Sequence, residues 1–151
     1  MQKAFGQHSG LVQAAITDFL FSFPLAIRLP NGIFCCHSLP TDAEILHFDY
    51  TVFSRPLTGA DYARGSGPVY QLIWGRKTTP KGVSAFAKAV GAELFITGHQ
   101  PQESGYAANG KHHLIIASDH NQGVFCHVTL STTYDMKALL RSLRKFVAVD
   151  A

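Results

Sequence analysis

The sequence has few charged residues and no long apolar run. Asp, Glu, Lys and Arg make up 15% of its 151 residues, whereas hydrophobic residues make up 46%. This balance excludes a disordered chain and predicts a single globular domain over residues 1–151. No apolar stretch reaches the roughly 18 residues of a membrane-spanning helix, and a net charge of +3 is too small to indicate nucleic-acid binding. We therefore expect neither a membrane nor a nucleic acid as partner.

Cysteine is also scarce. The chain has an odd number of cysteines, Cys35, Cys36 and Cys126, and the first two are adjacent. Residues 1–10 lack the apolar core of a secretory signal. No disulfide framework follows, so we expect a reducing, cytoplasmic location. Two cysteine-based sites stay open as alternatives: a thiol nucleophile at Cys35 or Cys36, and a zinc site with His112 and His113. Both are disfavoured, because the IFCC run is typical of a buried strand and adjacent strand residues point to opposite faces.

Apolar spacing and turn residues predict the first half of the secondary structure. Asn31-Gly32 lies between two short apolar runs, which is a strong hairpin signal. Residues 38–68 carry many Pro and Gly and predict little regular structure beyond one or two helical turns capped by Thr41. The predicted elements are a helix over 11–21 and antiparallel strands over 25–29 and 33–36.

The second half alternates helices and strands. Thr79-Pro80 is typical of a helix start and Gly91 of a helix end. The predicted fold class is therefore mixed α/β, with a mixed sheet layered with helices. The predicted elements are a strand-like or short buried run over 69–74, a helix over 79–90, a strand over 93–97, a polar loop to residue 111, strands over 112–117 and 124–130 joined by a turn, and an amphipathic helix over 133–147.

Two histidines follow apolar strands at the same relative position. His37 follows the strand over 33–36, and Gly98-His99 follows the strand over 93–97. Functional groups collect at the carboxyl ends of strands in open α/β sheets, so we expect these two side chains to meet at one edge of the sheet. Imidazole is the commonest metal ligand. The pattern alone favours a simple hydrogen-bonding role for each histidine, and a metal site stays open as the alternative.

The segments around both histidines resemble a known family. Residues 23–40 (FPLAIRLPNGIFCCHSLP) and 96–106 (ITGHQPQESGY) are similar to the two histidine segments of serine/threonine phosphatases, which belong to the calcineurin-like metallophosphoesterases. Residues 69–76 (VYQLIWGR) resemble that family's LLWSDP segment, and 113–125 resemble its closing hairpin. The closest likeness is to the bacterial branch with HSLP. The resemblance implies the C-terminal half of a metallophosphoesterase β-sandwich flanked by helices.

The resemblance also implies roles for four residues. His37 and His99 would bind one ion of a two-metal site, with Mn, Fe or Zn as the metal. Arg76 is a candidate phosphate clamp, with a surface ion pair as the alternative. His120 would donate to the leaving group or orient the phosphate, with a turn-stabilising role as the alternative. The implied activity is hydrolysis of a phosphorylated protein or a small phosphoester.

Three motifs of the family are absent. GDxHG, GDxxD(R) and GNH(E/D) supply its remaining metal ligands, yet this sequence contains no Gly-Asp and no Asn-His dipeptide. We therefore expect little or no activity from this chain alone, and a missing N-terminal half or a partner chain that completes the site. A truncated or split product, a fragment and a degenerate homologue all stay open. The alternative function is a non-catalytic binding or interaction domain with the same fold.

Overall fold

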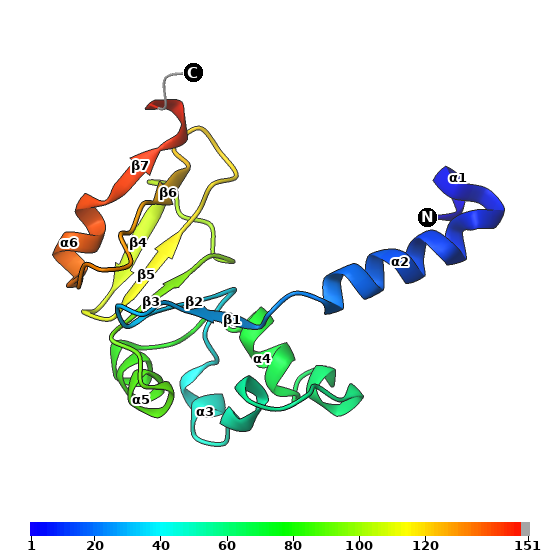
Figure 1. Ribbon diagram of the computed structural model, residues 1–151, viewed down its shortest axis with the longest axis horizontal. Helices are drawn as coiled ribbons and strands as arrows, with labels where there is room; N and C mark the ends of the chain where they lie inside the picture. Colours follow the sequence, from blue (N-terminus) through cyan, green and yellow to red (C-terminus); the bar gives the residue numbers. More distant parts are fainter. Residues whose placement is uncertain (149–151) are drawn as a thin grey trace.

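The computed structural model describes residues 1–148, and a five-stranded mixed sheet lies at its centre (Figure 1). The strand order is β1-β2-β3-β5-β4, in which β2, β3 and β5 run parallel and the two outer strands run antiparallel to their neighbours. The predicted mixed α/β class is confirmed. The strands are β1 (Ala26–Arg28), β2 (Ile33–Cys36), β3 (Leu94–Thr97), β4 (Tyr106–Asn109) and β5 (His113–Ile116).

The predicted hairpin forms β1 and β2. The turn closes through the Leu29 amide, which donates to the Ile33 carbonyl at 2.8 Å. Gly32 adopts a φ of 84°, a conformation that side chains rarely allow and that glycine adopts freely. The Asn-Gly pair thus fixes the register that aligns the ends of the first two strands.

Helices cover the first face of the sheet. Phe86 projects from the longest of them, is fully buried, and packs its ring against Phe95 of β3 at 5.6 Å and against Phe48 at 5.4 Å. This helix begins and ends as predicted, with Thr79 as its N-cap and Gly91 in the left-handed conformation at its end. The helices on this face are α3 (Asp42–Ile45), α4 (Pro68–Trp74) and α5 (Pro80–Val90) (Figure 1).

The second face is covered by the C-terminal segment. Leu139 of α6 is fully buried against Leu94 and Ile96 of β3 and Leu114 of β5. A separate two-stranded antiparallel sheet flanks this helix. The elements are β6 (Val124–Cys126), α6 (Met136–Arg141) and β7 (Leu143–Lys145).

Three sequence-based expectations are wrong. The run over 69–74 is the helix α4, because Pro68 starts it and only Val69 and Leu72, on one side, are buried. The loop expected before residue 111 contains β4, which exists by pairing with β5. The helix expected over 133–147 ends at Arg141, because the following residues pair with β6 instead.

The strands over 112–117 and 124–130 form as β5 and β6 but belong to different sheets. β5 pairs with β3 and β4, whereas β6 ends at Cys126 and pairs with β7. The two segments therefore do not form the hairpin that the family resemblance implied. One backbone bond still joins them, from the Val124 amide to the Ala117 carbonyl at 3.0 Å.

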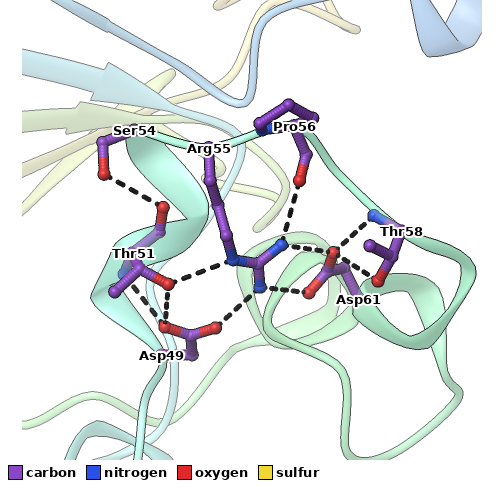
Figure 2. A network of polar contacts seen from close by, with 7 residues as sticks. All are labelled: Asp49, Thr51, Ser54, Arg55, Pro56, Thr58 and Asp61. Carbon is purple, nitrogen blue, oxygen red and sulfur yellow. Dashed lines mark hydrogen bonds and ion pairs between the residues drawn. The ribbon is translucent and has the colours of Figure 1, made fainter.

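An arginine organises the irregular segment between β2 and α4, as Figure 2 shows. Both terminal nitrogens of Arg55 donate to the carboxylate of Asp61, at 2.8 and 2.6 Å, and one also donates to Asp49 at 2.7 Å. Asp61 is buried and also accepts from the Thr58 amide at 2.6 Å. These bonds join the two short 3₁₀ helices of this segment, Tyr50–Phe53 and Gly59–Tyr62. The predicted cap of α3, Thr41, is confirmed as part of a capping box with Glu44.

The first 23 residues extend away from the sheet as an arm (Figure 1). It consists of α1 (Gln2–Phe5), a short 3₁₀ turn and α2 (Ser9–Phe21), so the predicted helix over 11–21 is confirmed. Neither helix has a buried residue. No helix in the described residues 1–148 combines the length and apolar character needed to cross a membrane.

Candidate metal centre

His37 and His99 lie side by side at one edge of the sheet. β2 and β3 are adjacent parallel strands in which Cys36 pairs with Thr97, so both strands end at the same level. Nε2 of His37 is 2.9 Å from Nδ1 of His99, and the two ring centroids are 4.7 Å apart. The meeting of these two side chains, expected from their positions after two strands, is therefore observed.

An unusual backbone conformation aims the ring of His99. This residue has a φ of 66°, the one positive φ outside glycine among residues 1–148. The preceding Gly98 amide donates to the His37 carbonyl at 3.1 Å, and the Gln100 amide donates to the Gly98 carbonyl at 2.8 Å. Conformations of this kind cost free energy and gather at functional sites. The tight turn therefore fixes both histidines relative to each other.

His37 is held by the residue that follows it. The Ser38 side chain is fully buried, and both its amide and its hydroxyl donate to the Leu72 carbonyl of α4, at 3.0 and 2.7 Å. The resembled family has Gly-Gly after this histidine, where this chain has Ser38-Leu39. Here the serine anchors the end of β2 to α4, which brings the end of that helix to the histidine pair.

Trp74 and Arg76 come from the end of α4 and the loop after it. The Trp74 ring stands edge-on to the His99 ring, with centroids 5.8 Å apart and planes at 88°. Arg76 is exposed, and within residues 1–148 its guanidinium makes no ion pair or hydrogen bond. Arg76 lies close enough for its charge to act on both histidines. The ion-pair alternative for Arg76 therefore has no support in the described chain.

Burial and then the charge of Arg76 lower the pKa of His37 below its usual value. The same two causes, followed by the charge of His37, lower the pKa of His99. Neutral imidazole is the form that binds metal ions. Both side chains are therefore held in the ligating form at neutral pH.

The donor set fits part of a metal site. The 2.9 Å between the two imidazole nitrogens is the length of a hydrogen bond between the rings, and it also matches two ligands of one ion, since metal–nitrogen bonds of about 2.0–2.1 Å place neighbouring ligands about 3 Å apart. Nε2 of His99 is buried without a hydrogen-bond partner, although ligating histidines usually donate from their second nitrogen. The described residues contain no group of three or more His, Cys, Asp and Glu side chains that could hold a metal. The two histidines therefore fit as two ligands, and the described residues do not complete a group of three around them.

His120 is engaged within its own turn. Its Nδ1 accepts from the Gln122 amide at 3.0 Å, so Nε2 carries the proton and donates to the Gln102 carbonyl at 2.8 Å. These bonds join the loop after His99 to the turn at 119–123. A cavity of about 240 Å³ separates the two segments and has His99 and Asp119 in its walls. The predicted catalytic role of His120 stays a prediction, and its observed contacts are those of a turn residue.

The cysteines do not offer a second chemistry. Burial, and secondarily the neighbouring Cys35, raises the pKa of the Cys36 thiol to about 12. Burial also raises the pKa of Cys35 and Cys126. A nucleophilic thiolate needs the opposite shift. The zinc alternative with His112 and His113 lacks a suitable ligand group among the described residues.

Trp74 is the part of this site that the sequence analysis did not assign. It is the one tryptophan of the chain and it is more than half exposed, which is a large apolar surface beside a polar pair. In the sequence, the position of Trp74 two residues before the candidate phosphate clamp Arg76 could have indicated its place at the site. Searches of protein-family models and of curated protein sequences found no match to this chain.

Proposed function

We propose that this chain provides part of a metal-dependent phosphoesterase site, with His37 and His99 as ligands of one divalent cation. The proposal rests on one observation: two neutral imidazoles from adjacent parallel strands present their nitrogens 2.9 Å apart. The likeness of residues 23–40 and 96–106 to serine/threonine phosphatases supports the same function. Mn, Fe or Zn would suit a site of imidazole and carboxylate ligands.

A divalent cation bound here would supply Lewis-acid activation of the phosphoryl group and of water. The chain's own residues would bind and orient the substrate. Arg76 has an exposed guanidinium without a partner among residues 1–148, and its planar fork matches two phosphate oxygens. Trp74 would form an apolar wall beside the pair and restrict the movement of the His99 ring. The substrate would be a phosphorylated protein or a small phosphoester.

The remaining ligands must come from outside the described residues. Two neutral ligands alone bind a divalent cation weakly, and the described residues contain no group of three or more His, Cys, Asp and Glu side chains that could complete the site. We propose that a partner chain, or a further segment that precedes this one, supplies the carboxylates. The chain alone would then bind metal weakly and turn over phosphoesters little or not at all.

Metal content tests the proposal without depending on activity. The purified chain would be equilibrated with Zn²⁺ or Mn²⁺, and its metal affinity measured by calorimetry and emission spectroscopy. His99→Ala and His37→Ala should each lower the affinity about tenfold or more. His47→Ala, at an exposed histidine near α3, is the matched control and should change nothing. Equal metal binding by His99→Ala and the unmodified chain would overturn the proposal.

The lack of a third ligand favours a second candidate, a non-catalytic binding or interaction domain. Inorganic phosphate separates the two candidates, because Arg76 has a function only in the first. With metal present, Arg76→Ala should weaken phosphate binding about tenfold, and Arg76→Lys should restore it in part. Absent phosphate binding together with absent metal binding would leave the interaction domain as the remaining candidate.

A further inference from the structure

The N-terminal arm, residues 1–23, presents apolar side chains without cover from the described chain. No residue of the arm is buried. Leu11 is 73% exposed, Phe19 62% and Phe21 59%, and Phe23 is also more than half exposed. Several large apolar side chains exposed together on one segment are typical of a surface that binds another molecule.

The composition of α2 indicates which kind of partner, a membrane or a protein, covers this helix. Asp18 is the one charged residue in its 13 positions, and apolar residues occur on all sides of the helix. A helix that is apolar all round is typical of an enclosed helix rather than one lying on a surface. At about 20 Å it is too short to span a bilayer, and it lacks the basic polar face of a helix that binds a membrane surface. The cover of α2 is therefore protein.

The same chain has an uncovered apolar groove at the root of the arm. Three hollows of about 550, 360 and 250 Å³ lie there; the third shares Leu57 with the first and residues 23–26 with the second. Phe21 stacks on Tyr62 at one end, with centroids 4.9 Å apart. Ile27, on the open edge strand β1, is 54% exposed at the other end. We call this surface the root groove; its lining includes Phe21, Phe23, Leu25, Ile27, Leu57 and Tyr62.

We propose that two copies of this chain exchange their arms, so that α2 of each copy lies in the root groove of the other. Figure 1 shows α2 pointing away from its own sheet, and Phe21, at its end, is the α2 residue that lines the root groove of the same copy. A two-fold exchange covers both surfaces on both copies at once and closes without further copies. The two α2 helices would also contact each other, which covers the side that the groove leaves exposed.

The available area is that of a stable dimer. Phe19, Phe21 and Phe23 are each more than half exposed, and at about 200 Å² per phenylalanine they offer about 350 Å². The exposed parts of Leu11, Ile16, Leu20, Phe5 and Met1 bring the arm to roughly 800 Å². A specific interface buries about 800 Å² on each partner. Phe21 and Phe23 also line the root groove, so the arm and the groove together offer the area of such an interface.

The mass of the intact chain in solution tests the exchange. Light scattering and sedimentation equilibrium should give a dimer at about 10 µM. Leu20→Glu on α2 should raise the dissociation constant about tenfold or more, since it places a charge in an enclosed apolar interface. Ile27→Glu in the root groove should have a similar effect. Both side chains are exposed within one copy, so circular dichroism should report an unchanged fold.

Leu46→Glu is the matched control, because Leu46 is 78% exposed and belongs to neither surface. It should leave the dissociation constant unchanged. A monomeric unmodified chain would overturn the proposal and would indicate that another protein covers α2. A dimer that tolerates Ile27→Glu but not Leu20→Glu would also overturn it, because it would be held by paired helices without exchange. Open-ended polymers would contradict the closed two-fold arrangement.

Discussion

The hydroxyl oxygen of Thr97 lies 2.8 Å from Nε2 of His113, between neighbouring strands in the interior of the sheet. Both residues are 2% exposed. Burial lowers the pKa of His113 from 6.5 to about 4, because the charged imidazolium is disfavoured in the core. As the pH falls through 6.5, His113 becomes protonated in the unfolded chain. In the folded protein it stays neutral until the pH approaches about 4.

This shift predicts a loss of stability in mild acid. Between pH 6.5 and 4 the unfolded state binds a proton at His113 that the folded state does not, so the free energy of unfolding falls as pH falls. From pH 7 to pH 5 the expected loss is about 2 kcal/mol. Urea unfolding at pH 7 and at pH 5 measures this loss. Both pH values lie above the range in which most carboxylates titrate. His113→Gln retains the bond to Thr97 and should remove most of this pH dependence, whereas His47→Gln should retain it. An unchanged pH dependence in His113→Gln would assign the effect to another group.

The arginine cluster of Figure 2 predicts unequal roles for its two carboxylates. Asp61 is 3% exposed and accepts two bonds from Arg55, which are the largest cause of its lowered pKa. The Asp49 side chain is 43% exposed and accepts one bond from Arg55. Asp61→Asn should therefore lower the urea midpoint clearly more than Asp49→Asn does. Arg55→Lys should be nearly as harmful as Arg55→Met, since an ammonium does not match the two-bond geometry. Equal midpoints for the two aspartate variants would contradict this account.

The parts of the fold that the sequence predicted are those with local causes. Asn31-Gly32 determines the hairpin through turn geometry. Thr79 and Gly91 determine the bounds of α5 through capping. The meeting of His37 and His99 followed from two strand ends, and it required only that β2 and β3 be adjacent and parallel.

The parts that the sequence did not predict depend on contacts between distant segments. β4, with the sequence YAAN, has no strand pattern of its own and becomes a strand because β5 offers a pairing edge. Leu143–Lys145 continues a helical pattern in sequence, yet pairing with β6 outweighs that local preference. Trp74 reaches His99 only because Ser38 fastens α4 to the end of β2. The two histidines at the strand ends were thus easier to predict than Trp74, which reaches them through a contact between distant segments.

The raised pKa of Cys36 predicts an inert thiol in the native protein. A pKa of about 12, compared with 9 for an exposed thiol, lowers the thiolate fraction about a thousandfold at pH 8. Alkylation of Cys36 by iodoacetamide, followed by mass spectrometry of the peptide, should be slow in buffer and fast in denaturant. A Cys36→Ser variant identifies the signal. Rapid labelling of Cys36 in the folded chain would contradict the burial on which this prediction rests.

The positive φ of His99 predicts that the backbone at this residue lowers the stability of the fold. A residue with a Cβ atom costs about 1 kcal/mol in this conformation, whereas glycine adopts it freely. His99→Gly should therefore unfold at a higher urea concentration than His99→Ala, by about 1 kcal/mol in free energy, although both variants lose the imidazole. The comparison isolates the backbone, because the two variants differ by one methyl group.

His37 provides the control, because its φ is not positive. There the order should reverse: His37→Gly should be less stable than His37→Ala by about 0.5–1 kcal/mol, since glycine gains conformational freedom in the unfolded chain without relieving strain in the folded one. If glycine is the less stable variant at both positions, the left-handed turn at His99 is not strained. The geometry that brings the two imidazoles to 2.9 Å would then cost the fold nothing.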